Sequence, residues 1–281
     1  DRLNHASLLD GGWISRSSFE WYPHRDIHEL EHVLGKVLTK TTRKLIVTDG
    51  TFSMDGDRAP IEGLVTTARK NDAWLMIDDA HGIGVHGTNG CGLVDPSIHT
   101  TDDVHILVGT LGKALGTSGA FVAGTEPLIE TLIQKSRNYI FTTAMPSALA
   151  EATLTSLRIA QKEKWRREKL ETLIKRFQRG VSEMGLKLLP SSSPIQPIVL
   201  GSPEQALKIS AALESSGCLC TAIRPPTVPK GTSRLRITLM ATHTEKDVDQ
   251  LLNALEMSLI DKNILSTNST DHSNIRVTTR K

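Results

Sequence analysis

Short apolar runs alternate with amphipathic segments along the first half of the chain. Between two of these runs lies segment 60–71, which opens with a proline and has helical spacing. Strands that alternate with helices predict an α/β domain with a mostly parallel sheet. A further helix is expected over 26–38, before the first strand. The predicted strands are 44–48, 74–79, 104–110 and 119–123.

The pattern changes near Pro146, where two helical stretches lead to Gly185. The later helix over 203–216 is marked by Ser202 as its N-cap and by Gln205 as the capping-box partner. Strands are predicted over 195–200, 218–224 and 233–239, and a last helix over 245–260. We therefore expect three parts, which are a large α/β domain (1–150), a small α+β domain with its connecting helices (151–260) and a mobile polar tail (261–281).

Composition excludes several classes of protein. The 281 residues are 38% hydrophobic and 23% charged, as in an ordinary globular chain, and the net charge of +2 indicates no nucleic-acid partner. No apolar stretch approaches the roughly 20 residues that cross a bilayer, so no membrane partner is expected. Cys91, Cys218 and Cys220 are too few for a secreted disulfide scaffold. Cys218 and Cys220 are expected on one face of a strand.

The first candidate site follows the apolar run 74–77. Asp78, Asp79 and His81 come where a buried parallel strand ends, and open α/β sheets bind ligands at that edge. Buried carboxylates need a cation or a hydrogen-bond donor. The alternative is a solvated loop with a helix-capping aspartate.

The second candidate is Lys113, between glycines in segment 109–116 and just past another strand. Its amine is a possible nucleophile if its pKa is lowered, and the alternative is a surface lysine. The segment is not a Walker A loop, because Leu107 stands where glycine is required and Ala114 follows the lysine.

Two other motifs carry less weight. Segment 82–87 matches the dinucleotide pattern G-x-G-x-x-G, but turn-forming residues follow it where a helix should begin. A histidine stripe could hold a metal, although solvated residues beside an apolar helix face explain it better, so no metal is predicted. The stripe consists of His24, His28 and His32, with Glu29 or Glu31 nearby.

Two single residues complete the candidates. Ser53 follows the strand 44–48, where ordinary turn chemistry also favours serine. Arg236 alternates with apolar residues on a predicted strand and shares a face with Arg234. An arginine in this position suits a carboxylate ligand, and the alternative is an exposed edge charge.

The candidates become informative together. An aspartate, a histidine three residues later and a lysine past the next strand are all expected at one rim of the sheet. This combination fits pyridoxal 5'-phosphate, which needs a lysine for its Schiff base and a carboxylate to keep its ring nitrogen protonated.

Several motifs then resemble the α-oxoamine synthases, pyridoxal-phosphate enzymes of fold type I. The resemblance covers about residues 1–260 and implies a homodimeric, cytoplasmic, fold type I transferase. It also implies about a hundred further residues before Asp1, including a turn that helps to bind phosphate, so we expect an incomplete N-terminal part. The motifs are DRLNHASL (1–8), FSMDGD (52–57), DDAHG (78–82), TLGK (110–113) and FTTAMP (141–146).

The resemblance implies a role for each site residue. Lys113 would link to the cofactor and transfer protons, His5 would stack on the ring, and Asp78 would pair with the ring nitrogen. Ser53 and His81 would hydrogen-bond the ring hydroxyl. Phosphate would be bound by Thr110, and by Thr142 or Thr143 toward a neighbouring subunit. Substrate would be bound by Arg236 at its carboxylate, with Thr227 nearby and His5 positioning the incoming acyl group.

The stretch 222–229, followed by 234–236, most resembles the biotin-synthesis branch of the family. That branch condenses L-alanine with a pimeloyl thioester of CoA or a carrier protein and releases carbon dioxide. The alternatives are a 2-amino-3-oxobutyrate CoA ligase, a 5-aminolevulinate synthase, a serine palmitoyltransferase-like enzyme or a non-catalytic fragment.

Overall fold

The structure, a computed structural model, describes residues 1–37 and 43–260. The chain forms two compact units. The first holds residues 1–53 and 57–167, and the second holds residues 54–56 and the chain from Glu168 onward. The tail expected over 261–281 lies outside the described residues. No helix in the described ranges is both long and apolar enough to cross a membrane.

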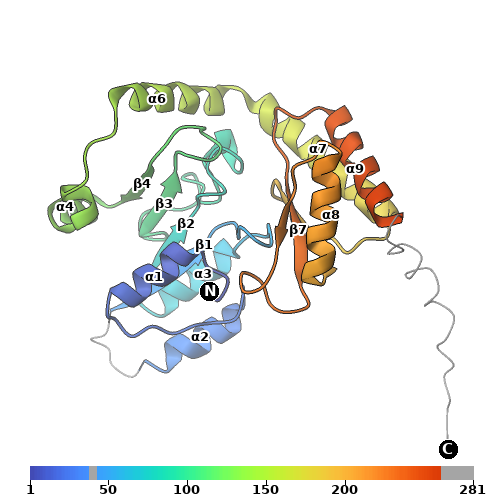
Figure 1. The fold of residues 1–281 in the computed structure, drawn as a ribbon. Coiled ribbons are helices and arrows are strands. Elements are labelled where there is room, and N and C mark those ends of the chain that lie inside the picture. Colours follow the sequence, from blue (N-terminus) through green and yellow to red (C-terminus); the bar gives the residue numbers. More distant parts are fainter. Residues whose placement is uncertain (38–42, 261–281) are drawn as a thin grey trace, which may run out of the picture. The chain divides into compact units, whose positions relative to one another are not determined.

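The first unit contains a four-stranded sheet (Figure 1). The first three strands are parallel, and the fourth runs antiparallel to the third. The mostly parallel sheet is therefore confirmed, with strand ends within two residues of the predicted ones. In spatial order the strands are β1 (Lys44–Asp49), β2 (Ala73–Asp78), β3 (Ile106–Thr110) and β4 (Ala120–Gly124).

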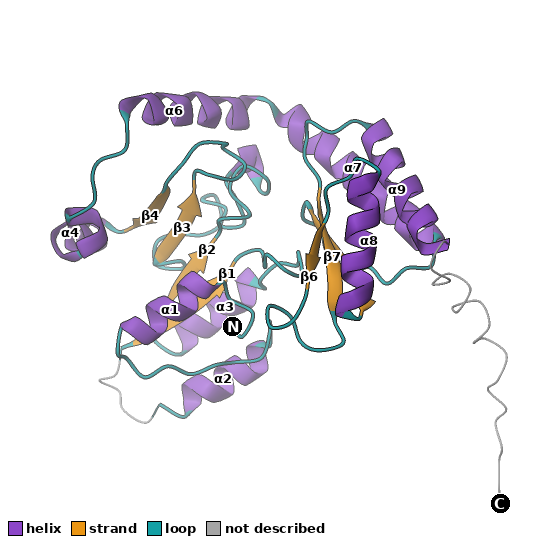
Figure 2. Cartoon of the chain, viewed as in Figure 1, coloured by secondary structure: helices purple, strands orange, loops and turns teal. Residues whose placement is uncertain are grey.

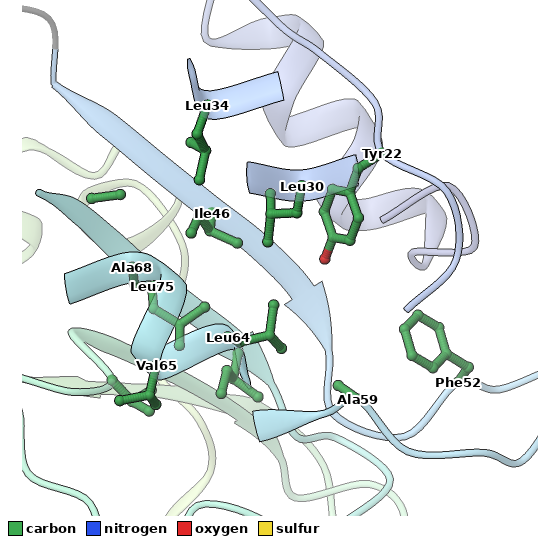
Figure 3. Packing of buried hydrophobic residues seen from close by; sticks show 13 residues of the cluster. Tyr22, Leu30, Leu34, Ile46, Phe52, Ala59, Leu64, Val65, Ala68 and Leu75 are labelled. Atoms are coloured by element: carbon green, nitrogen blue, oxygen red, sulfur yellow. The ribbon is translucent and has the colours of Figure 1, made fainter. Parts of the chain in front are cut away.

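The core of this unit lies against β1 and β2. Helix α2 (Ile27–Gly35) begins after Asp26, whose carboxylate accepts the N–H of Glu29 at 2.9 Å, so the predicted helix start is confirmed. The last residue of the predicted helix, Leu38, lies outside the described residues. Figure 3 shows how α2 and α3 (Ile61–Lys70) pack their apolar side chains on the strands. The packed side chains include Leu30, Leu34, Ile46, Leu64, Val65 and Leu75.

Three α-helices of the first unit are absent from the sequence prediction. None of the three buries a residue, although the second of them, over 126–135, does carry apolar residues at helical spacing that the prediction missed. The three helices are α1 (Ala6–Ile14), α4 (Glu126–Lys135) and α5 (Arg137–Ile140). The predicted α6 (Ser147–Lys162) comes next and buries Thr153.

In the second unit, two long helices and α8 accompany a three-stranded antiparallel sheet of order β5–β7–β6 (Figure 2). Ser202 accepts the N–H of Gln205 at 3.1 Å, so the predicted N-cap of α8 is confirmed. Cys218 and Cys220 precede β6, so the expectation that they share its face is wrong. The elements are α7 (Lys164–Glu183), β5 (Ile195–Gly201), α8 (Pro203–Ser215), β6 (Thr221–Ile223), β7 (Ser233–Thr238) and α9 (Glu245–Ile260).

Candidate functional site

Two carboxylates lie side by side where β1 and β2 end. Asp49 and Asp78 are register partners in the parallel pair, and both are buried. The N–H of Ala80 donates to Asp78 Oδ1 at 3.0 Å. This placement at the carboxyl edge of the sheet agrees with the expectation for Asp78, and we call the pair the carboxylate rim.

Lys113 reaches the same region from the loop that joins β3 to β4. Its Nζ lies 3.0 Å from Nε2 of His81, and its charge acts on Asp49. Helix α6 holds the loop in place, because the Ser156 hydroxyl donates to the Leu115 carbonyl at 2.7 Å. Three residues predicted to lie near one another, Asp78, His81 and Lys113, are thus brought to one edge of the first unit.

Asp49 belongs to this site, although the sequence analysis did not select it. The backbone N–H of His5 donates to Asp49 Oδ2 at 2.6 Å. The pKa of Asp49 is raised to about 7, chiefly by burial and also by neighbouring Asp78, while the His5 N–H and the charge of Lys113 oppose the rise. The available signal was the aspartate that ends strand 44–49, as Asp78 ends the next strand.

His5 begins α1 as its N-cap. Its Nδ1 accepts the N–H of Ser7 at 3.3 Å and lies 2.8 Å from the Ser7 hydroxyl. The ring itself is exposed. The side chain is therefore fixed at one ring nitrogen and accessible on its surface, as a ring that stacks on a ligand must be.

Asp79 is fully buried behind the carboxylate rim. Its Oδ2 accepts the N–H of Leu93 at 2.6 Å, whereas its Oδ1 has no hydrogen-bond partner among the described residues. A β-carbon on Gly50, Gly82 or Gly92 would overlap this carboxylate, and we call these three residues the glycine cage. Burial raises the pKa of Asp79 to about 7; Asp78 adds to the rise and Arg58 opposes it.

The glycine cage also explains the G-x-G-x-x-G segment. Residues 82–87 form turns and lead into a short 3-10 helix, Thr88–Gly90, rather than an α-helix. Gly82 leaves room for Asp79 instead of opening a dinucleotide site. The interpretation against dinucleotide binding agrees with this geometry.

The predicted phosphate ligands and the predicted ring ligand Ser53 belong to the first unit. Thr110 donates its hydroxyl to the Gly119 carbonyl at 3.2 Å and accepts the N–H of Gly112 at 3.3 Å. Thr142 and Thr143 are exposed after α5, and Ser53 is half-buried after β1. Their roles in binding a cofactor stay predictions.

The predicted substrate ligands belong to the second unit. Arg236 is half-buried on β7, with Pro197 and Thr221 as its register partners, and Thr227 is exposed. Arg234 donates to Asp55 Oδ1 at 2.7 Å within the same unit, so this arginine has a structural ion pair. The substrate roles of Arg236 and Thr227 stay predictions.

The histidine stripe does not exist on the helix. His24 precedes α2, and its two ring nitrogens lie 3.1 Å from Asp1 Oδ1 and 2.9 Å from Asp57 Oδ2. His28 and His32 are exposed on α2. In the parts of the chain that the structure describes, no group of three or more side chains is arranged to hold a metal ion.

The donor set of the first unit fits pyridoxal 5'-phosphate. An accessible lysine amine beside a histidine suits the aldehyde end of the cofactor, and a buried carboxylate at the sheet edge suits a protonated ring nitrogen. The exposed ring of His5, a residue whose backbone N–H is held by Asp49, adds a stacking surface. Lys113, Asp78, His81 and His5 are therefore the residues that could hold the group.

Comparisons with known proteins agree with this geometry. The chain is 58% identical over 255 residues to the 8-amino-7-oxononanoate synthase of Saccharophagus degradans, covering 91% of this chain and 64% of that one. The chain thus spans less than two thirds of this relative's length.

Solved structures give the same fold. A serine palmitoyltransferase from S. paucimobilis with bound PLP–myriocin aldimine has a TM-score of 0.87 and 30% identity, covering 93% of this chain and 66% of that one. An 8-amino-7-oxononanoate synthase from Francisella tularensis has a TM-score of 0.81 and 29% identity, covering 94% and 75%.

A family model for aminotransferase class I and II matches residues 1–255. The match includes the carboxylate rim, Lys113 and the strands of both units. With its mixed sheet, its rim of acids and its lysine loop, the chain belongs to the aminotransferase class I and II family.

Proposed function

We propose that the full-length protein is a pyridoxal-phosphate-dependent acyltransferase. It condenses L-alanine with pimeloyl-CoA, or with the pimeloyl carrier protein, and gives 8-amino-7-oxononanoate, carbon dioxide and the free thiol. The observation that carries the proposal is the contact of Lys113 Nζ with His81 Nε2 at 3.0 Å, beside the carboxylate rim. The 58% identity to a synthase of that name supports the choice of substrates.

Lys113 holds the cofactor and then acts as a base. Its amine would hold the cofactor at the aldehyde end, and the same amine would be available as a base once substrate is bound. His81 keeps the lysine amine in position through its Nε2, and a neutral amine there accepts the α-proton of the substrate. When bound, the cofactor supplies an electron sink for the charge left on the α-carbon.

Asp78 has the complementary role at the other end of the ring. It is buried, so a positive charge that meets it is worth more than the same charge in water. The carboxylate therefore favours the protonated ring nitrogen, and its hydrogen bond from the Ala80 N–H fixes its orientation. His5 stacks on the ring, Ser53 and His81 bind the ring hydroxyl, and Thr110 binds phosphate in this proposal.

Two residues of the second unit are proposed as substrate ligands. The guanidinium of Arg236 suits a carboxylate such as that of alanine, and Thr227 is the second of these residues. The protein is also proposed to be cytoplasmic and to form a homodimer in which Thr142 or Thr143 contacts the partner's phosphate. The exposed aromatic rings of Tyr139 and Phe141, next to these threonines, support the dimer. Residues 1–150 form the cofactor domain and residues 151–260 the small domain.

Lys113→Ala tests the function directly. The full-length protein should show a near-visible absorbance band with pyridoxal 5'-phosphate, and borohydride should remove it. The variant should lose both the covalent link and the condensation, because no other group replaces the amine. A surface variant, Lys135→Ala on α4, is the matched control. A band that persists in Lys113→Ala would reject the role of this lysine.

Substrate choice separates the proposal from its rival, a serine palmitoyltransferase-like enzyme, which the TM-score of 0.87 to such a protein favours. The loaded protein is offered alanine, glycine or serine with pimeloyl-CoA and palmitoyl-CoA. Product from alanine and pimeloyl-CoA supports the proposal. Turnover of serine with palmitoyl-CoA, and none of alanine, would establish the rival instead.

A further inference from the structure

We propose that Asp49 is a positioning residue that holds His5 in place over the cofactor, an inference that rests on the proposed function. Asp49 ends β1, and its side chain accepts the backbone N–H of a residue 44 positions earlier in the chain at 2.6 Å. The proposed stacking residue is therefore tied to the sheet at its backbone.

Hydrogen bonds run in both directions between this part of β1 and the start of α1, and they include Asn4, the residue before His5. The backbone N–H of Asp49 donates to Asn4 Oδ1 at 3.1 Å, and Asn4 Nδ2 donates to the Val47 carbonyl at 2.9 Å. Asn4 and Asp49 are both buried, in contrast to the exposed ring of His5. These three hydrogen bonds, which we call the Asn4–Asp49 clamp, fix the point at which α1 begins.

The clamp restrains the His5 ring through the backbone of the same residue. The His5 backbone is held by Asp49, and the other end of the residue is held at Nδ1 by Ser7. A side chain fixed at both ends loses little further freedom when a ligand stacks on it, which is the condition for a preorganised site. Loss of the clamp would free α1, which buries no side chain of its own.

A role in folding alone does not explain why the acceptor in the clamp is a carboxylate. A neutral acceptor could bind the His5 N–H without the cost of placing a second carboxylate next to Asp78. At this edge the two carboxylates lie near Lys113, with His5 and His81 close by. Two acids beside Lys113 suit a site that receives one more positive charge, as a protonated ring nitrogen would supply.

The test compares Asp49→Ala, which removes the acceptor, with Asp49→Asn, which keeps an acceptor oxygen and removes the charge. The first readout is hydrogen exchange of the His5 amide in the cofactor-free, full-length protein. Loss of a charge-assisted hydrogen bond should speed this exchange about 10- to 100-fold in Asp49→Ala. Asp49→Asn should stay within a few-fold of the native rate. Asp10→Ala, which removes an exposed carboxylate of α1, is the matched control.

The second readout is the circular dichroism of the near-visible band in the protein loaded with pyridoxal 5'-phosphate. Asp49→Ala should keep the band but lose most of its dichroism and most of kcat, and Asp49→Asn should restore the larger part of both. Native exchange and native dichroism in Asp49→Ala, or equal losses in the two variants, would overturn the positioning role. A native protein without the band would instead reject the proposed function, and the exchange rates would still decide whether Asp49 holds His5.

Discussion

The two halves of the four-stranded sheet are packed to different degrees. β1 and β2 are covered by α2 and α3 on the face where Leu75 of β2 is fully buried, while Leu45 and Trp74 on the other face are half exposed. β4 carries the 43%-exposed Val122, and the helices around it bury almost nothing. The carboxylate rim belongs to the packed half, whereas Lys113 lies on a loop of the exposed half.

This difference in burial suits the chemical roles of the carboxylates and of Lys113. Exclusion of water raises the pKa of a carboxyl group, and burial does this for Asp49 and Asp79. A lysine that exchanges one bound amine for another must be reached by substrate, and Lys113 is exposed. The site therefore joins a rigid acidic side to an accessible basic side, and each half can be tested separately.

The largest expected effect comes from the packed half. Leu75→Ala should reduce the free energy of unfolding by about 2–5 kcal/mol, because it leaves a cavity between β2 and the helices. Val122→Ala on β4 is the matched control and should cost less than about 1 kcal/mol. Urea unfolding of the full-length protein measures both. Equal losses would mean that the two halves are equally packed and would break the comparison.

The next effect concerns the buried acid of the glycine cage. Between its ordinary pKa of 3.8 and about 7, Asp79 keeps a proton in the folded state that the unfolded chain has released. Its contribution to stability is therefore present at low pH and is lost as the pH rises to 7. The native protein should lose roughly 1 kcal/mol per pH unit in this window relative to Asp79→Asn.

Unfolding midpoints in urea at several pH values measure this difference. Asp102→Asn, which removes an exposed carboxylate before β3, is the control for the change of net charge. A difference between the native protein and Asp79→Asn that stays constant from pH 4 to pH 7 would show that burial does not control this acid.

The smallest effect on stability belongs to the exposed half. Phe141 is 70% exposed, so Phe141→Ser should change the free energy of unfolding by no more than about 0.5 kcal/mol. The same change should weaken self-association if this surface is the subunit interface. Sedimentation at several concentrations measures the association, with Leu219→Ser, an exposed position of the second unit, as the control. Unchanged association would remove this surface from the proposed dimer.

Prediction from the sequence succeeded to different degrees in the same two halves of the sheet. Apolar spacing identified α2 and α3, because Leu30, Leu34 and Leu64 point into one core. Helices α1, α4 and α5 were not predicted; α4 has apolar residues at helical spacing, but none of the three buries a side chain. Helices of that kind depend on neighbouring segments that a local pattern does not record.

The site was predicted in part for a related reason. Asp78, His81 and Lys113 stand out because each follows a strand or its turn, and the structure brings them to one edge. The contact of Asp49 with His5 joins residues 44 apart and leaves no periodic trace. The glycine cage is equally long-range, since Gly50 and Gly92 become neighbours of Asp79 only through the fold.

The glycine cage limits how this protein can be altered. Each of the three glycines faces the same carboxylate, so random mutagenesis of any one of these positions should return only glycine. Replacing the buried acid by a smaller apolar residue would require substitutions at several of these positions at once. Engineers who wish to reshape the cofactor pocket would therefore do better to leave this block intact and diversify the exposed loop from which the lysine projects.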